Sequence, residues 1–267
     1  MDVGGLGLGL STILYIWRIP LKKAIKKIAN FGYEGLEIRA GEPDASSRKL
    51  SGGDRRKLRT LIQSRNLNLY SLTPDWADIN LASPNPMMRQ ESIREVKEAI
   101  ELAWDLGAQY FTLPLGRRYS IGAAPKKKAE DWALDSLESC LSFAEKSGVT
   151  ICLEGYPGQV FGSAEGLLKV ARKFHSKSLR IAGDASIAHA TGDLSAFFKK
   201  IKEYIGLVHI SDSEHLPPGL GRIDFRVMFD ALKKIGYKGN YLLEIYYPND
   251  PDWAAKHARA YVSKLVK

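Results

Sequence analysis

Polar side chains that could bind a metal ion or move protons stand at the ends of four short apolar runs. They are Glu154 in ICLEGYP, Asp184 in RIAGDAS, His209 in LVHISD and Glu244 in YLLEIYY. The intervals are 30 residues (154 to 184), 25 (184 to 209) and 35 (209 to 244). A barrel of eight βα units in about 250 residues uses roughly 31 residues per unit. We therefore expect all four side chains to converge from neighbouring strands.

Such a convergence would need a cation. Three carboxylates beside one imidazole would repel one another strongly if nothing lay between them. Oxygen ligands with a single nitrogen suit Mn²⁺, Mg²⁺, Co²⁺ or Zn²⁺, and the sequence does not choose among them. The pattern predicts one divalent metal ion. Each acid considered alone could instead be an exposed residue or a salt-bridge partner. His209 considered alone could instead be a strand histidine hydrogen-bonded to a neighbour.

The elements that must position these residues alternate along the whole chain. Short apolar runs typical of buried strands are each followed by an amphipathic helical segment. This alternation predicts an α/β fold, and its eight repeats favour a closed (β/α)₈ TIM barrel over an open sheet, as a single domain over residues 1–267. The expected helices span 21–31, 54–65, 88–106, 131–146, 164–174, 194–204, 225–235 and 253–265.

The formal net charge of +9 raises the question of a nucleic-acid partner. The basic residues are spread over helical segments such as PLKKAIKKIANFGY and FFKKIKEYIG, which is typical of solvated outer faces, although anionic substrates stay open. Cys140 and Cys152 have no metal-ligand spacing and are expected to be buried free thiols in a reducing cytoplasm. We expect a cytoplasmic protein with no membrane partner, because no run is apolar enough to span a bilayer.

The whole chain resembles the xylose isomerase-like TIM barrels, a superfamily of sugar isomerases and epimerases, inosose dehydratases and endonuclease IV. The motifs that carry the resemblance are GYEGLEI, LASPNP, AIELAWDLGAQYFTLP, LEGYP, GDASIAHATG, VHISD, HLPPGLGRIDF and IGYKGNYLLEI. They are specific for the superfamily and not for one activity. The resemblance implies that Glu154, Asp184, His209 and Glu244 hold one divalent metal, and that Glu154 and Glu244 act as acid and base in epimerase and isomerase members.

That role is chemically sound. A metal chelated by adjacent oxygens of an open-chain sugar acidifies the hydrogen beside the carbonyl and stabilises the enediolate. Two carboxylates on opposite sides of the carbon can then remove and return the proton.

The chain departs from endonuclease IV at several ligand positions. His215 is retained, but the other extra metal ligands of that enzyme are replaced by Ser71 or Thr73, Leu113, Ile187 and Ser213. These losses argue against a three-metal phosphodiesterase and against a nucleic-acid partner. Ile187 also occupies the position of a substrate-contacting histidine in epimerases, and whether His189 substitutes for it stays open.

Residues at other strand ends are candidates for substrate binding: His215, Glu37, Trp17, Trp76 and Arg117. Glu37 faces the same way as Arg39 by strand alternation, so a mutual surface pair is the alternative. The tryptophans would form apolar walls against a sugar or else pack under loops, and Arg117 would hold a phosphate or carboxylate or else be solvated. Asp212 is expected to be a second-layer acid or a loop anchor.

Together these observations predict a metal-dependent isomerase or epimerase. It would act on a small sugar, sugar phosphate or polyol-derived ketone by proton transfer through an enediolate. The alternatives are an inosose-type dehydratase, an endonuclease IV-like AP endonuclease acting on DNA, and a binding barrel without turnover. The expected partner is a small carbohydrate, and a homo-oligomer is left open.

Overall fold

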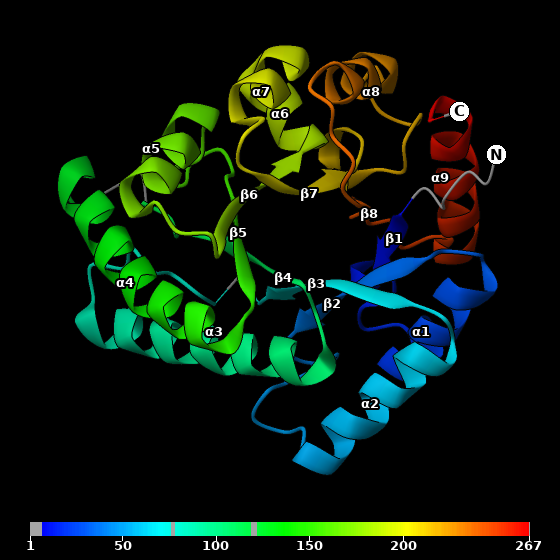
Figure 1. Ribbon diagram of the computed structural model, residues 1–267, viewed down its shortest axis with the longest axis horizontal. Coiled ribbons are helices and arrows are strands. Elements are labelled where there is room, and N and C mark those ends of the chain that lie inside the picture. Colours follow the sequence, from blue (N-terminus) through cyan, green and yellow to red (C-terminus); the bar gives the residue numbers. More distant parts are fainter. Residues whose placement is uncertain (1–6, 76–77, 119–121, 267) are drawn as a thin grey trace.

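Parallel strands form a closed barrel at the centre of the molecule, and helices surround it (Figure 1). The computed structural model describes residues 7–75, 78–118 and 122–266. The strands follow one another around the barrel in sequence order, and β1 closes it by pairing with β8. The predicted (β/α)₈ barrel is confirmed. The strands are β1 (Leu8–Ser11), β2 (Gly35–Ala40), β3 (Asn68–Pro74), β4 (Tyr110–Pro114), β5 (Thr150–Glu154), β6 (Leu179–Asp184), β7 (Ile205–Ile210) and β8 (Tyr241–Leu243).

The α-helices follow the predicted segments to within three residues at each end, apart from two larger differences, and the short 3₁₀ helices η1 and η2 were not predicted. Helix α4 begins at Lys126 instead of residue 131, because Pro125 ends the preceding loop and the lysines after it are good helix formers. A short helix, α6, follows β6 directly and was not predicted; the side chain of Asp184 caps it. The helices are η1 (Thr12–Tyr15), α1 (Leu21–Asn30), α2 (Gly52–Ser64), α3 (Pro86–Leu106), α4 (Lys126–Ser147), α5 (Ala164–Phe174), α6 (Ala185–Thr191), α7 (Leu194–Ile201), η2 (Ser213–His215), α8 (Phe225–Lys234) and α9 (Pro251–Leu265).

A small apolar layer fills the barrel interior below the predicted site. It consists of Tyr70, Cys152, Ala182, Leu207 and Leu242, all buried. The last four stand two residues before Glu154, Asp184, His209 and Glu244, so strand alternation directs each pair to the same side. The layer is closely packed: a Cβ on Gly35 would lie 2.3 Å from the Tyr70 ring. The polar groups of the predicted site thus lie directly above a tightly packed apolar layer.

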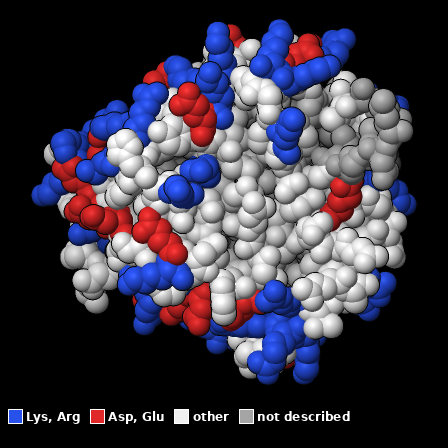
Figure 2. Space-filling model, in the orientation of Figure 1, with Lys and Arg blue, Asp and Glu red and all other residues white. Residues whose placement is uncertain are grey.

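The outer surface carries the basic charge. In Figure 2, lysines and arginines lie mainly around the edge of the molecule, interspersed with acidic side chains, while the middle of that face is largely uncharged. This distribution agrees with solvated helix faces. Cys140 and Cys152 are both buried free thiols, as predicted. None of the described helices is both long and apolar enough to span a membrane.

Candidate metal centre

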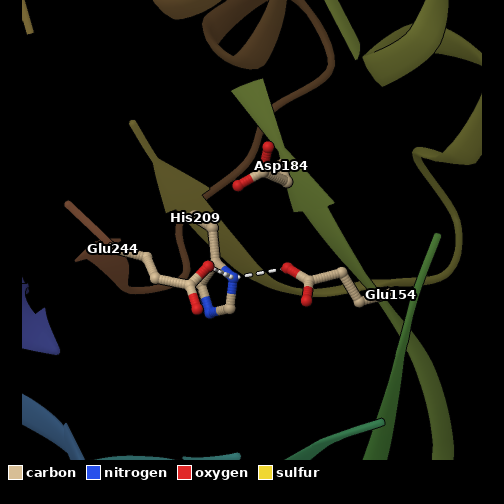
Figure 3. Close-up of side chains that lie close together, drawn as sticks. All are labelled: Glu154, Asp184, His209 and Glu244. Atoms are coloured by element: carbon tan, nitrogen blue, oxygen red, sulfur yellow. Dashed lines mark hydrogen bonds and ion pairs between the residues drawn. The ribbon is translucent and has the colours of Figure 1, made fainter. Parts of the chain in front are cut away.

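Glu154, Asp184, His209 and Glu244 converge at the C-terminal ends of β5 to β8. One potential ligand atom from each residue lies within 4.8 Å of those of all the others. Asp184 and His209 are partners in the β6–β7 register, and Glu244 directly follows β8. Figure 3 shows the carboxylates and the imidazole turned toward a common centre. All four residues are buried. The short distances between their ligand atoms confirm the prediction that the four side chains converge.

Hydrogen bonds orient part of this cluster and leave other atoms free to bind something else. The Nδ1 atom of His209 lies 2.6 Å from Glu154 Oε1 and 3.4 Å from Glu244 Oε2. Asp184 Oδ1 accepts hydrogen bonds from the Ser186 hydroxyl at 2.7 Å and the Ile187 N–H at 2.8 Å. Asp184 Oδ2 and Glu244 Oε2 are buried without a hydrogen-bond partner among the described residues. Such groups are costly unless they are paired or bind a cation.

The two glutamates have pKa values displaced in opposite directions. Burial raises the pKa of Glu244 to about 7, and the charge of Glu154 adds to the rise. Burial also acts to raise the pKa of Glu154, but the charge and hydrogen bond of His209, with a hydrogen bond from Tyr156, bring it below the ordinary value. Neighbouring carboxyls whose pKa values are driven apart are suited to serve as a proton donor and a proton acceptor.

The donor set fits a divalent cation. Burial opposes charge on His209, yet Glu154, Glu37 and Glu244 raise the pKa of its imidazole well above the usual value. Burial and the charge of Glu154 raise the pKa of Asp184. These raised pKa values mean that the metal-free cluster binds protons more tightly than free side chains would, which reduces its negative charge. A divalent ion bound by carboxylate oxygens and one imidazole nitrogen would relieve the same charge.

Tyr156 is a part of this site that the sequence interpretation missed. Its hydroxyl donates a hydrogen bond of 2.5 Å to Glu154 Oε2. The residue stands two positions after Glu154, just beyond the end of β5. Its spacing from Glu154 was the signal that could have identified it, because side chains two residues apart turn the same way where the chain continues extended.

A cavity of about 230 Å³ opens next to the cluster. Its wall is mostly apolar or aromatic, with His215, Glu214 and Glu244 as polar members; the other lining residues are Ile13, Tyr156, Ile245 and Tyr246. The His215 Nδ1 atom lies 3.3 Å from the Glu244 backbone oxygen. His215 thus lines the cavity beside a cluster residue, and its role in substrate binding stays a prediction.

The other substrate candidates are placed differently. Glu37 is fully buried against His209, and Arg39 pairs with Asp75, so the alternative of a mutual Glu37–Arg39 surface pair is wrong. The Trp17 side chain is 74% exposed and does not line the cavity. Arg117 also lies outside the cavity lining, and its N–H donates to Asn80 Oδ1. Trp76 lies outside the described residues.

The residues at the positions where endonuclease IV has its extra metal ligands make other contacts. Ile187 is buried and Ser71 is bonded to Thr112, while His189 is exposed on α6. In the described part of the chain, the four-residue cluster is the group found with metal-ligand geometry. The prediction against a three-metal phosphodiesterase is consistent with this arrangement.

Comparisons with known proteins agree with the barrel fold. Fructoselysine 3-epimerase of Shigella flexneri is 24% identical over 254 residues, covering 90% of this chain and 91% of that protein. The crystal structure of a D-tagatose 3-epimerase-like protein has a TM-score of 0.85 at 25% identity, covering 97% of this chain and 96% of that chain. The IOLI protein, solved with a zinc atom bound, has a TM-score of 0.82 at 22% identity, covering 97% of each chain. Residues 25–265 match a family defined by this fold, and the chain therefore belongs to the xylose isomerase-like TIM barrel family.

Proposed function

We propose that this protein is a sugar epimerase that uses one divalent metal ion held by Glu154, Asp184, His209 and Glu244. The observation that carries the proposal is the pair Glu154 and Glu244, buried in one cluster with pKa values displaced in opposite directions. The named epimerases to which the chain is similar support the same reaction type. Zinc in the IOLI protein supports a divalent ion.

The proposed reaction exchanges a hydrogen on the carbon beside the substrate carbonyl. When bound, the metal ion would polarise the carbonyl and stabilise the negative charge that develops as the C–H bond breaks. Glu154, the more acidic carboxyl, accepts the proton, and its orientation is maintained by the Tyr156 hydroxyl. Glu244, with a pKa of about 7, delivers a proton to the opposite face of the carbon. His215, at the cavity mouth, contacts a substrate hydroxyl.

Exchange of the substrate hydrogen with solvent deuterium tests this proposal. The protein would be incubated with Mn²⁺ and a panel of ketoses in D₂O, and deuterium incorporation followed by NMR and mass spectrometry. We expect Glu154→Gln and Glu244→Gln each to lower the exchange rate by about 10² to 10⁴-fold, the usual contribution of a general acid or base. The matched control is Glu101→Gln, at an exposed position on α3, which should leave the rate unchanged.

The same assay separates the rival reactions. An epimerase conserves the mass of the substrate apart from the deuterium, whereas an inosose-type dehydratase gives a product lighter by one water. Exchange that continues at the wild-type rate in both glutamine variants would overturn the assignment of the acid and base.

The cavity favours an unphosphorylated sugar. Glu214 and Glu244 are the carboxylates in its lining, and no lysine or arginine is among the described residues that line it. A phosphate dianion would meet like charge there, which costs affinity. We expect kcat/KM for a free ketose to exceed that for its phosphate ester. The reverse order in steady-state assays would contradict this assignment.

A further inference from the structure

Strand β2 places a carboxylate behind the candidate metal centre, on the side of His209 that faces away from the other ligands. Glu37 Oε2 lies 3.4 Å from His209 Nε2, and both side chains are fully buried. We infer that Glu37 is a positioning residue: it accepts the Nε2–H of His209 and thereby directs Nδ1 toward the metal ion. This inference rests on the metal centre of the proposed function and adds a fifth residue to it.

The two nitrogens of His209 face different partners. Nδ1 points into the cluster, 2.6 Å from Glu154 Oε1, whereas Nε2 points at Glu37. A histidine that binds a metal through one nitrogen must carry its proton on the other, and a carboxylate or carbonyl usually accepts that proton. The orientation of the ring therefore assigns Nδ1 to the metal and Nε2–H to Glu37.

A structural role for Glu37 explains its position poorly. Both of its oxygens are buried without a hydrogen-bond partner among the described residues, and so is His209 Nε2. Arg39 on the same strand gives its guanidinium to Asp75 and to the Glu42 carbonyl. A buried carboxylate without a hydrogen bond lowers the stability of a fold unless a neighbouring group compensates its charge, and His209 is the group that lies beside it. The contact with His209 explains why a carboxylate stands here: when Nδ1 binds a metal ion, Nε2 carries a proton that Glu37 can accept.

Glu37 is also separated from the space available to a substrate. It does not belong to the lining of the cavity beside Glu244. Its partners in the strand register are Ser11 on β1 and Ser71 on β3, across the barrel from β7. An effect of Glu37 on the reaction would accordingly pass through His209 and the metal ion.

The test measures metal binding and the histidine proton without using activity. The Zn²⁺ dissociation constant would be measured by competition with a chromophoric chelator for wild type, Glu37→Gln, Glu37→Ala and Ser71→Ala. Ser71 is a matched control, because it is fully buried beside Glu37 in the register but bonds to Thr112. The Nε2–H of His209 would be observed by ¹H–¹⁵N NMR of the zinc-loaded proteins.

We expect Glu37→Ala to weaken zinc binding by about 10 to 100-fold, the usual effect of removing such a partner, and to remove the protected Nε2–H signal. Glu37→Gln, which keeps an acceptor oxygen, should fall between Glu37→Ala and wild type, and Ser71→Ala should match wild type.

Two results would overturn the inference in distinguishable ways. Wild-type zinc affinity and an unchanged Nε2–H signal in Glu37→Ala would remove Glu37 from the centre while leaving the metal site intact. Failure of the wild-type protein to bind zinc would refute the metal centre itself. Loss of metal-free stability in Glu37→Ala, with unchanged zinc affinity in the folded fraction, would make the residue purely structural.

Discussion

Tyr156 determines how the Glu154 carboxylate is oriented and how readily it accepts a proton. Its hydroxyl keeps its proton, since burial and the charge of Glu154 raise the pKa of Tyr156 well above its usual value. The hydrogen bond to Glu154 Oε2 stabilises the ionised carboxylate. Hydrogen bonds to charged groups contribute about 1.5 to 3 kcal/mol, so this contact is large enough to affect the rate.

We predict that Tyr156→Phe raises the pKa of Glu154. It should also slow deuterium exchange by about tenfold near pH 7, equivalent to about 1.4 kcal/mol, because the carboxylate loses the hydrogen bond that orients it toward the substrate. The acid limb of the pH–rate profile should move to higher pH, because Glu154 must lose its proton before it can act as a base. Tyr246→Phe is the control: Tyr246 lines the same cavity and is 47% exposed. An acid limb that moves equally in both variants would refute a specific role for Tyr156.

The sequence was informative about residues on one strand and uninformative about contacts across the barrel. Glu154 and Glu244 could be predicted because each ends an apolar run at the expected interval, and parallel strands bring such ends together. The contact between Glu37 and His209 could not, because it joins β2 to β7 and depends on barrel closure and on the rotation of the imidazole ring. The orientation of Asp184 likewise depends on hydrogen bonds from α6 to its Oδ1 atom, and α6 was not predicted.

At the scale of elements, one buried side chain binds the segment between β7 and α8 at three points. Asp212 is fully buried, and its carboxylate accepts hydrogen bonds from the N–H groups of Ser213, Gly219 and Ile223 at 2.8, 2.8 and 3.0 Å. A Cβ on Gly221 would lie 2.3 Å from the Asp212 carboxylate, so the chain wraps it closely. Of the two expectations for Asp212, the contacts favour the loop anchor.

We predict that Asp212→Ala destabilises the protein by on the order of 3 kcal/mol, because three backbone N–H groups lose the charged acceptor of their hydrogen bonds. His215 belongs to this segment and lines the cavity, so KM for sugar should rise while zinc affinity is retained. Urea unfolding, steady-state kinetics and chelator competition would measure the three effects. In contrast, Asp224→Ala, at the exposed N-cap of α8, should cost less stability and leave KM unchanged. A rise in KM in both variants would mean that the anchor does not shape the site.

At the scale of the whole molecule, protons and the metal ion compete for the same cluster, which couples folding stability to pH. The pKa of Glu244 is about 7 in the folded protein against an ordinary 4.5. A carboxyl whose pKa is raised by folding contributes stability that is fully present below about 4.5 and is lost as the pH rises through about 7. The raised pKa of His209 acts in the same direction. The metal-free barrel should therefore become less stable over this interval, since the cluster loses protons that only the folded state binds tightly.

Metal binding should reverse this loss, because the ion needs Glu244 and His209 without their protons. We predict that the difference in Tm between zinc-loaded and chelator-treated protein widens from pH 5.5 to pH 8. Free metal at 100 times its Kd stabilises a folded protein by about 2.7 kcal/mol, which corresponds to about 5–10 °C for a chain of this size. Scanning calorimetry of both forms would measure the difference. The Glu244→Gln variant, which cannot ionise at this position, should show a smaller metal response and a weaker dependence on pH. An equal rise in Tm at pH 5.5 and pH 8 would mean that metal and protons do not compete at this cluster.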